Sequence, residues 1–371
     1  MKRLVLVLAL LYPALAFADF QAGLDAYNRG DYATAHGEWL LLAERGDARS
    51  QGLLGLMYAE GLGLPQDYVE AEKWYRLAAA QGSADAEYNL GLMYEKGQGF
   101  PRDFAEAVKW YRLAARKDYA SAQYNLGNMH YNGYGVAKND AAALKWYRLA
   151  AKQGYANAQF RLGWMYYKGQ GVATDYAEAV KWYWSAAKQD HARAQDLLGS
   201  MYVEGQGVPQ NPAEAVKWYR QSAEQQYAGA QYHLANMYYD GQGIATDYAE
   251  AVTWYRRAAE QSHAKARFRL GWMYDSGQGV ARDYVEAVKW YQLAAKQGYV
   301  SAQYNLGIMY AKGQGLPQDY VRAHAWFNIA ATQGNEPAVN NRDVLSGVMT
   351  PAQLEAAQEL SRELWEQYGN K

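Results

Sequence analysis

The sequence predicts an all-α protein: a right-handed α/α superhelical solenoid in which helix-turn-helix units stack along the chain. Three observations support this fold class. Trp recurs every 36 residues, an Ala lies three residues before each of these Trp residues, and a Gly-x-Gly recurs once per period without insertion or deletion. A repeat at a fixed period of this length is typical of solenoids. The eight Trp residues, which we assign to the core, are Trp74, Trp110, Trp146, Trp182, Trp218, Trp254, Trp290 and Trp326.

The second helix of each unit has the clearest pattern, as in residues 103–115. Ala107, Trp110 and Tyr111 fall at spacings of three and four, which places them on one helical face. Asp103 and Glu106 resemble a capping box, in which two side chains satisfy free N–H groups of the first turn. The acidic residues that recur at these positions are therefore interpreted as helix caps and not as catalytic pairs.

The first helix of each unit is represented by residues 122–131, in which Leu126, Gly127 and Met129 recur in the other units. A Gly inside a helix costs about 1 kcal/mol relative to Ala, so we expect the neighbouring helix to approach closely at Gly127. Ala235 stands at the equivalent position and indicates that one methyl group is accommodated there. No unit can bury its Trp-Tyr face alone, so neighbouring units must stack.

Both ends of the repeat array are expected to be caps. Residues 19–47 form a looser helix pair in which Trp39 lies 35 residues before Trp74, out of step with the period. Residues 336–371 are expected to hold an irregular connector to Met349 and then a capping helix. The sequence Thr350-Pro351-Ala352-Gln353 predicts the start of that helix, with Pro at its first position and Gln353 reaching back.

The first 18 residues have the features of a signal peptide. Lys2 and Arg3 precede an apolar stretch from 4 to 15, and Ala16-Phe17-Ala18 supplies a cleavage site before Asp19. The alternative is a membrane anchor, but the stretch is shorter than the roughly 20 residues of a spanning helix. We therefore expect an exported protein, periplasmic in the first place and secreted as the alternative. The predicted domains are 1–18, 19–47, 48–335 and 336–371.

The composition excludes several functional classes. Lys and Arg number 37 against 38 for Asp and Glu, so no basic excess exists for a nucleic-acid partner. The chain has no Cys, which removes disulfides and thiolate metal sites. The six His residues are scattered, and the Gly-x-Gly lacks the neighbours that a phosphate loop needs. We expect no catalytic residue, no metal, no cofactor and no stable membrane span.

The repeated units resemble Sel1-like repeats, which are relatives of tetratricopeptide repeats. The matching pattern is Ala-x-Ala-x-x-x-Leu-Gly-x-Met-Tyr-x-x-Gly-x-Gly, followed by Asp-Tyr-x-Glu-Ala-x-Lys-Trp-Tyr-x-x-Ala-Ala-x-Gln-Gly, and it covers residues 48–335. The resemblance implies a two-layered superhelix with the first helices on its concave side. It also implies an adaptor that holds protein complexes together, and it assigns no catalytic residue.

Three rows of residues share the other face of the first helices, at spacings of four and three. By the family geometry this face lines the concave groove, and its members vary between units while the frame does not. Large rigid aromatic side chains are typical of binding hot spots. The alternative is that the first, aromatic row only packs between repeats. The candidate binding residues are Tyr124, Asn128, Tyr131, Phe160, Trp164, Tyr167, Tyr232, Asn236, Tyr239, Phe268 and Trp272.

These observations favour an exported, non-catalytic scaffold that binds a protein or a peptide, in the cell envelope or at a host surface. Two alternatives stay open. One is an enzyme or carbohydrate-binding protein acting on cell-wall or glycan material, and the other is a passive spacer. The sequence leaves the oligomeric state and the partner's identity undetermined.

Overall fold

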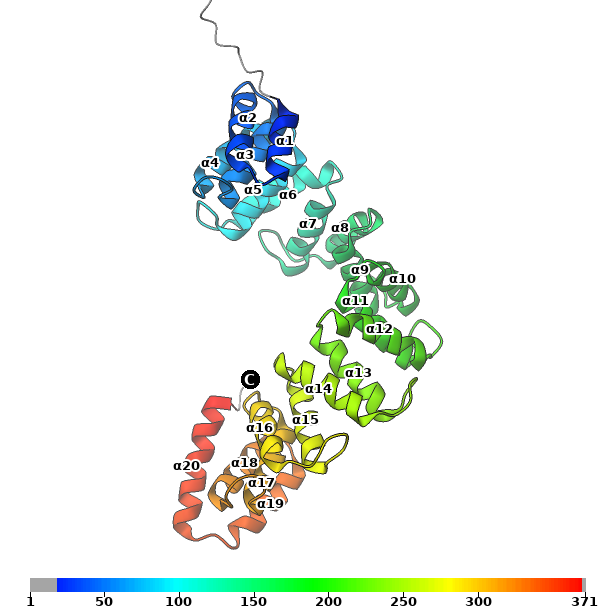
Figure 1. Ribbon diagram of the computed structural model, residues 1–371, viewed down its shortest axis with the longest axis vertical. Helices are drawn as coiled ribbons and strands as arrows, with labels where there is room; N and C mark the ends of the chain where they lie inside the picture. The colour runs from blue at the N-terminus through cyan, green and yellow to red at the C-terminus, as the bar shows by residue number, and fades with distance from the viewer. Residues whose placement is uncertain (1–18, 369–371) are drawn as a thin grey trace, which may run out of the picture. The chain divides into compact units, whose positions relative to one another are not determined.

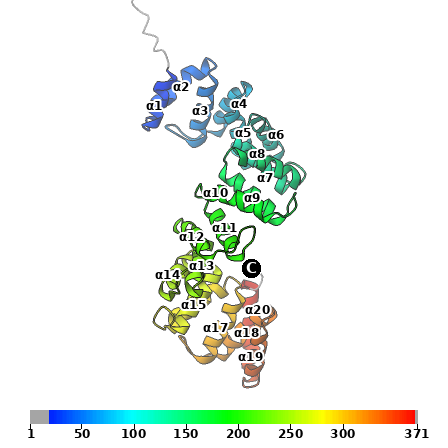
Figure 2. The same ribbon diagram turned by 90° about the vertical axis from the view of Figure 1, so that its right-hand side faces the viewer.

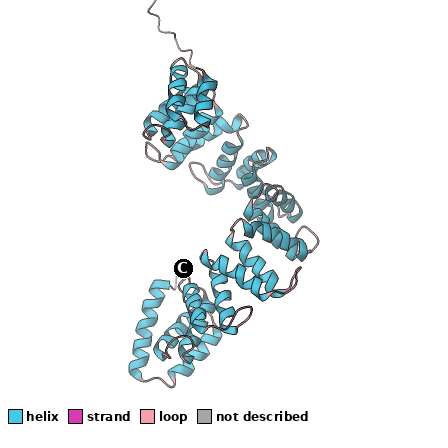
Figure 3. Ribbon diagram, viewed as in Figure 1, coloured by secondary structure: helices cyan, strands magenta, loops and turns pink. Residues whose placement is uncertain are grey.

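The computed structural model describes residues 19–368, and within them it contains 20 α-helices and no strand (Figure 3). The proposed signal peptide at 1–18 lies outside the described residues. The chain divides after Thr174 into two compact units. The first unit holds α1 (Phe20–Asn28), α2 (Tyr32–Glu44), α3 (Ala48–Glu60), α4 (Tyr68–Ala80), α5 (Ala84–Lys96), α6 (Phe104–Arg116), α7 (Ala120–Asn132), α8 (Asp140–Lys152) and α9 (Ala156–Lys168).

The second unit begins with a second helix of a repeat and ends with the C-terminal helix. It holds α10 (Tyr176–Ala187), α11 (Ala192–Glu204), α12 (Pro212–Glu224), α13 (Ala228–Asp240), α14 (Tyr248–Glu260), α15 (Ala264–Ser276), α16 (Tyr284–Ala295), α17 (Val300–Lys312), α18 (Tyr320–Thr332), α19 (Glu336–Ser346) and α20 (Pro351–Tyr368). Within each unit, successive helices pack against one another as far as α19, and α20 packs against α18 (Figures 1 and 2). The predicted all-α architecture of stacked helix-turn-helix repeats is therefore confirmed.

Capping fixes where the second helices begin. Oδ1 of Asp103 accepts hydrogen bonds from the backbone N–H groups of Ala105 at 2.8 Å and Glu106 at 3.0 Å. The expected capping box is half right, because the Glu106 carboxylate does not reach back and instead accepts a bond from Lys109 at 2.6 Å. The reciprocal box does occur at the start of α20. There the Thr350 N–H donates to Gln353 at 2.9 Å, and the Gln353 N–H donates to Thr350 at 3.3 Å.

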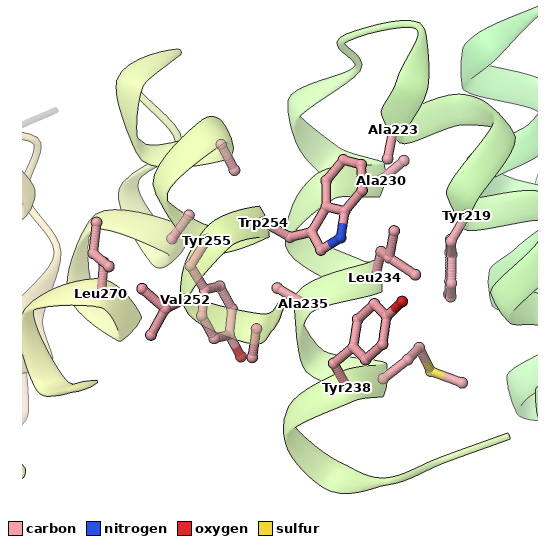
Figure 4. Close-up of a cluster of buried hydrophobic side chains, with 14 of the residues drawn as sticks. Tyr219, Ala223, Ala230, Leu234, Ala235, Tyr238, Val252, Trp254, Tyr255 and Leu270 are labelled. Atoms are coloured by element: carbon pink, nitrogen blue, oxygen red, sulfur yellow. The ribbon is translucent and has the colours of Figure 1, made fainter. Parts of the chain in front are cut away.

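The Tyr that follows each Trp is the deepest large side chain of its repeat. Tyr111 and Tyr255 have no exposed surface. The Trp residues were all expected in the core, but only Trp74, Trp254 and Trp326 are buried, and the other five are half-buried. Figure 4 shows why the roles differ: Trp254 reaches from α14 past Ala230 of its own repeat toward Ala223, at the end of the preceding repeat. The Trp joins one repeat to the previous one, and the Tyr fills its own repeat.

The recurrent Gly of the first helix faces that buried Tyr. A Cβ on Gly127 would lie 2.6 Å from Cε1 of Tyr147, so the ring packs directly on the helix backbone, as the sequence predicts. The Gly-x-Gly has two different roles. Gly133 ends α7 in the left-handed region with φ of 77°, and a Cβ on Gly135 would meet the carbonyl group of Phe104 in the preceding repeat. The second Gly is therefore a packing contact between repeats.

The two ends correct the sequence interpretation. Trp39 is fully buried, and its ring lies against Gly23 as the Tyr of each repeat lies against its Gly. Trp39 thus occupies the Tyr position and not a displaced Trp position, which explains the spacing of 35. The connector expected after residue 335 is wrong between Glu336 and Ser346, where the chain forms α19. Both α19 and α20 pack against α18.

A row of buried Gln side chains ties successive repeats together. For example, Nε2 of Gln123 donates to the carbonyl oxygen of Ala115 in the preceding repeat at 3.2 Å, and Oε1 of Gln123 accepts from Gln153 at 2.8 Å. The same two bonds recur at Gln51, Gln195, Gln231 and Gln303. Each bond to a helix-end carbonyl satisfies an acceptor that the helix itself leaves open.

Candidate functional site

The candidate residues lie on one face of the first helices, which we call the aromatic face. The face has three rows of residues, and each of the two units carries its own part of it. In the first unit Tyr124, Asn128 and Tyr131 lie on α7, and Phe160, Trp164 and Tyr167 lie on α9. In the second unit Tyr232, Asn236 and Tyr239 lie on α13, and Phe268 and Trp272 lie on α15. All are half-buried except Phe160, which is buried.

The first row of the aromatic face packs between repeats. The ring centroid of Tyr124 lies 5.8 Å from that of Tyr147 and 5.3 Å from that of Tyr155 in the next repeat. Tyr232 stacks on His263 at 4.8 Å. The other described members make the same kind of contact: Tyr88 with Tyr111 and Tyr119, Phe268 with Tyr291 and Tyr299, and Tyr304 with Phe327. This row therefore has a packing role.

Asp196 interrupts the first row and is buried. Its Oδ1 lies 2.7 Å from Nδ1 of His233, so a hydrogen-bonded pair replaces the ring contact. A cavity of about 260 Å³ is lined by His233 and Ser200 among others. The Ser200 hydroxyl lies 3.0 Å from the hydroxyl of Tyr219 and donates to the Asp196 carbonyl oxygen at 3.2 Å. Among the described residues Ser200 has no hydrogen bond to His233, so the three side chains do not form a Ser-His-Asp relay.

The second row receives the hydroxyl groups of the buried tyrosines. Tyr147 donates to Oδ1 of Asn128 at 2.7 Å, and Tyr255 donates to Oδ1 of Asn236 at 2.5 Å. Burial raises the pKa of both Tyr hydroxyls, so they stay protonated donors. Each Asn keeps its Nδ2 group as a donor on the aromatic face.

The two Trp residues of the second row lie among aromatic and cationic groups. The ring centroid of Trp164 lies 6.1 Å from that of Tyr167, and the ammonium group of Lys168 lies 5.0 Å from the Trp164 ring. Trp272 meets Tyr239 edge-on at 5.8 Å. In the third row, Tyr131 donates to Gln170 at 3.0 Å and Tyr239 donates to Gln278 at 3.2 Å. These bonds hold the rings in place.

The sequence interpretation missed two cations of the same face. The guanidinium carbon of Arg161 lies 5.9 Å from the Tyr131 ring centroid, and that of Arg269 lies 5.8 Å from the Tyr239 ring centroid. Both Arg side chains are half-buried. A signal was present, because each Arg begins the identical segment Arg-Leu-Gly-Trp-Met-Tyr at 161–166 and at 269–274.

The His residues have structural roles where their contacts are described. Nδ1 of His191 accepts the Ala194 N–H at 3.1 Å, and Nδ1 of His263 accepts the Ala266 N–H at 3.2 Å, so both cap helices. Burial lowers the pKa of both imidazoles. Within residues 19–368, no three side chains of the metal-ligating types come together in a possible metal site. No helix in this range is long and apolar enough to cross a bilayer.

The fold and this face define the class: a helical-repeat protein whose distinctive surface is a row of half-buried aromatic, amide and guanidinium groups. The family model of the Sel1 repeat matches residues 48–83, 84–119, 120–155, 156–191, 192–227, 228–263, 264–299 and 300–335. The chain therefore belongs to the Sel1 repeat family, as the resemblance predicted.

Two solved structures show the same family relationship. One is a protective antigen of uropathogenic Escherichia coli that displays an SLR fold. It is 34% identical with a TM-score of 0.58, over 94% of this chain and 84% of that chain. The other is a Sel1 repeat protein from Oxalobacter formigenes. It is 34% identical with a TM-score of 0.65, over 83% of this chain and 89% of that chain. A search of curated proteins found no match.

Proposed function

We propose that this protein is a non-catalytic scaffold that holds a protein or peptide partner on the aromatic face of its first helices. Sel1 repeat proteins are generally protein-interaction scaffolds. The observation that supports the site most directly is the pair Trp164 and Trp272, half-buried on the face at positions where other repeats have Asn, Ser, Leu or Ile. Aromatic anchors in such surroundings carry a large share of binding energy.

The experiment compares Trp residues on and off the face. We expect the double variant Trp164→Ala and Trp272→Ala to weaken capture of the partner at least tenfold, because the two indoles together contribute more than about 1.4 kcal/mol of binding. Capture is measured by photocrosslinking from the face, followed by affinity measurement with the identified partner. The matched control is Trp184→Ala, which removes a 41% exposed indole from α10, a second helix.

Two outcomes count against the proposal. Equal loss of capture in the Trp184 variant would indicate nonspecific binding through exposed aromatic side chains and not binding by the aromatic face. No specific partner at either crosslinking position would leave the chain as a passive spacer. Thermal unfolding of each variant shows whether the helices are intact.

The same proposal includes export through cleavage before Asp19, into the periplasm or beyond. The backbone N of Asp19 lies 2.9 Å from Oε2 of Glu38 on α2. Cleavage of the peptide bond before Asp19 would convert its backbone amide into a charged amino group, with the Glu38 carboxylate already beside it. The intact mass of the protein from its native host tests this, and a chain that keeps residues 1–18 would contradict it.

A carbohydrate-binding protein for cell-wall or glycan material is the second candidate. The observation that favours it is the approach of Trp and Asn side chains on one face, since a ring stacks on a sugar and an amide bonds its hydroxyls. Titration with soluble cell-wall fragments tests it with the same Trp variants. Turnover of those fragments would instead support an enzyme.

A further inference from the structure

The aromatic face carries one cluster of side chains twice, three repeats apart. The Arg161 cluster comprises Asn128, Tyr131, Arg161 and Gln170 of the first unit. The Arg269 cluster comprises Asn236, Tyr239, Arg269 and Gln278 of the second unit. Each member of the second follows its counterpart by 108 residues, since 269 − 161 = 108, and 108 is three periods of 36. The two clusters also share their bonds, from Tyr to Gln and from a buried Tyr to Asn.

The Arg residues replace a different type of side chain at their position. Two residues at the equivalent position reach back to the first row of the preceding repeat: His233 bonds Asp196, and Asn341 on α19, after the last repeat, donates to Tyr304 at 3.3 Å. Neutral amides suffice for that packing role. A guanidinium brings a fixed positive charge and five N–H donors. Only repeats four and seven, which also carry the face Trp residues, have Arg there.

Neither guanidinium has a carboxylate partner. Each of the twelve ion pairs in the described residues involves other side chains, and the half-buried Arg161 and Arg269 take part in none. A partly desolvated charge without a counterion is costly unless a ligand supplies one, and this holds for Arg161. The charged form of Arg269 is already favoured by Tyr255, by a hydrogen bond with Tyr232 and by Asp240. The structure thus leaves a cation at the centre of each cluster.

The groups around Arg161 present donors rather than acceptors. The Asn128 oxygen is occupied by Tyr147, which leaves the Nδ2 group to donate. A second cation lies near the same ring as Arg161: the ammonium group of Lys138 is 5.9 Å from the centroid of the Tyr131 ring. A site of N–H donors beside two cations fits an anionic acceptor group, and a planar carboxylate matches the fork of an Arg.

The Arg269 cluster is a weaker version of the same site. Thr246 replaces Lys138, and Asp240 replaces Asn132. Burial lowers the pKa of the Arg269 guanidinium, but Tyr255 and Tyr232 outweigh it and raise the pKa, and the negative charge of Asp240 adds to the increase. A ligand anion there meets one cation fewer and one negative charge more.

We propose that the two clusters are duplicate carboxylate-binding sites, each of which holds an acidic side chain of an extended partner segment beside an aromatic residue that packs on Trp164 or Trp272. This inference rests on the proposed function and specifies its partner: a protein that presents an Asp or Glu next to an apolar residue, in two copies. Charge complementarity is the observation that selects the occupant.

The test uses the whole chain with labelled Trp indoles and a blocked peptide, acetyl-Gly-Glu-Tyr-Gly-amide. Nuclear magnetic resonance follows the indole N–H signals of Trp164 and Trp272 during titration. We expect saturable shifts of both signals, with tighter binding at Trp164. The same peptide with Gln for Glu is expected to bind at least tenfold more weakly, because charge-assisted hydrogen bonds are about twice as strong as neutral ones.

Variants assign each response to one Arg. Arg161→Gln should abolish the shift at Trp164 and keep that at Trp272, and Arg269→Gln should do the reverse. Arg161→Lys retains the charge and should keep more affinity than Arg161→Gln, which separates charge recognition from packing. Arg116→Gln, at the exposed end of α6, is the matched control and should change neither signal.

Four results would overturn the inference. They are equal binding of the Glu and Gln peptides, shifts that survive Arg161→Gln and Arg269→Gln together, no shift at either indole, or inorganic phosphate or glucuronate that binds more tightly than the peptide. None of them would affect the proposed function, which depends on capture of the whole partner through the Trp residues. Loss of partner capture in the Arg variants alone would support the inference on the natural ligand.

Discussion

Four residues at the end of the second helices adopt a backbone conformation that favours Gly. Gly82, Gly154, Gly298 and Gly334 have φ between 78° and 88° at this position. Other repeats place Asp118, Asp190, Gln226 and Ser262 there, with φ between 58° and 67°. The left-handed region costs a non-Gly residue roughly 1–2 kcal/mol, so these repeats end their helices under strain.

Gln226 allows this strain to be measured, because its side chain is exposed. We expect Gln226→Gly to stabilise the protein by about 1 kcal/mol, since the left-handed penalty exceeds the entropy that Gly adds to the unfolded chain. Urea unfolding followed by circular dichroism gives the change in free energy. The reciprocal control is Gly154→Ala: nothing lies within 4 Å of the added Cβ, so a loss of similar size would come from φ alone. A destabilised Gln226→Gly variant would contradict the argument.

At the scale of helices, one repeat pair replaces the buried Gln contact by an ion pair. Glu87 takes the place of the first Gln and Lys117 that of the second, with Nζ and Oε1 2.6 Å apart. The Glu87 side chain is only 5% exposed, whereas that of Lys117 is 40% exposed. Lys117 also donates to the carbonyl oxygen of Gly82, just after the end of α4, at 2.9 Å.

The exchange predicts strong coupling between the two positions. Lys117→Gln alone should destabilise the protein by about 2 kcal/mol, because it leaves a buried carboxylate without a counterion. The double variant Glu87→Gln and Lys117→Gln should recover most of this loss, because positions 87 and 117 would then form the same Gln–Gln contact as Gln123 and Gln153. A double-mutant cycle in urea measures the coupling energy. Additive effects of the two substitutions would contradict a shared contact.

The two helices of each repeat were predictable because every repeat has the same local sequence signals. The periodicity of Trp and Tyr predicted both helices, and the Asp caps predicted where the second helices begin. Periodicity failed where the signals changed: α19 lacks the Trp-Tyr pattern, and Trp39 fills a Tyr position in a pair with a shorter link. The binding site was harder to predict, because the row of Tyr124 and the row of Trp164 both recur every 36 residues. Only the structure shows that the Tyr124 ring packs on Tyr147, whereas Trp164 lies beside Tyr167. Arg161 carries no signal within a single repeat, because its segment recurs only after three repeats, at Arg269.

At the scale of the molecule, stability in a repeat protein is approximately a sum over repeats and their interfaces. Small terms that recur along the chain therefore accumulate. Burial lowers the pKa of His36, His130, His191, His263 and His324 below the ordinary value of 6.5. Above about pH 6.5 these imidazoles are neutral in both the folded and unfolded states, and the native contacts are fully favoured.

Acid should therefore weaken the fold through these His residues. As the pH falls below 6.5, the unfolded chain binds protons that the folded chain resists, so the free energy of unfolding decreases until each folded pKa is reached. The slope is at most about 1.4 kcal/mol per pH unit for each His. We expect the double variant His191→Tyr and His263→Tyr to lose less stability between pH 7.5 and pH 5 than the natural sequence. Tyr is the residue of other repeats at this position, and its ring keeps the packing that His263 makes with Tyr232. Urea unfolding at both pH values gives the comparison, with Asp196 and Lys265 as the charged neighbours of His263 left unchanged. An equal loss in both proteins would show that carboxylates, and not these two imidazoles, control the acid response.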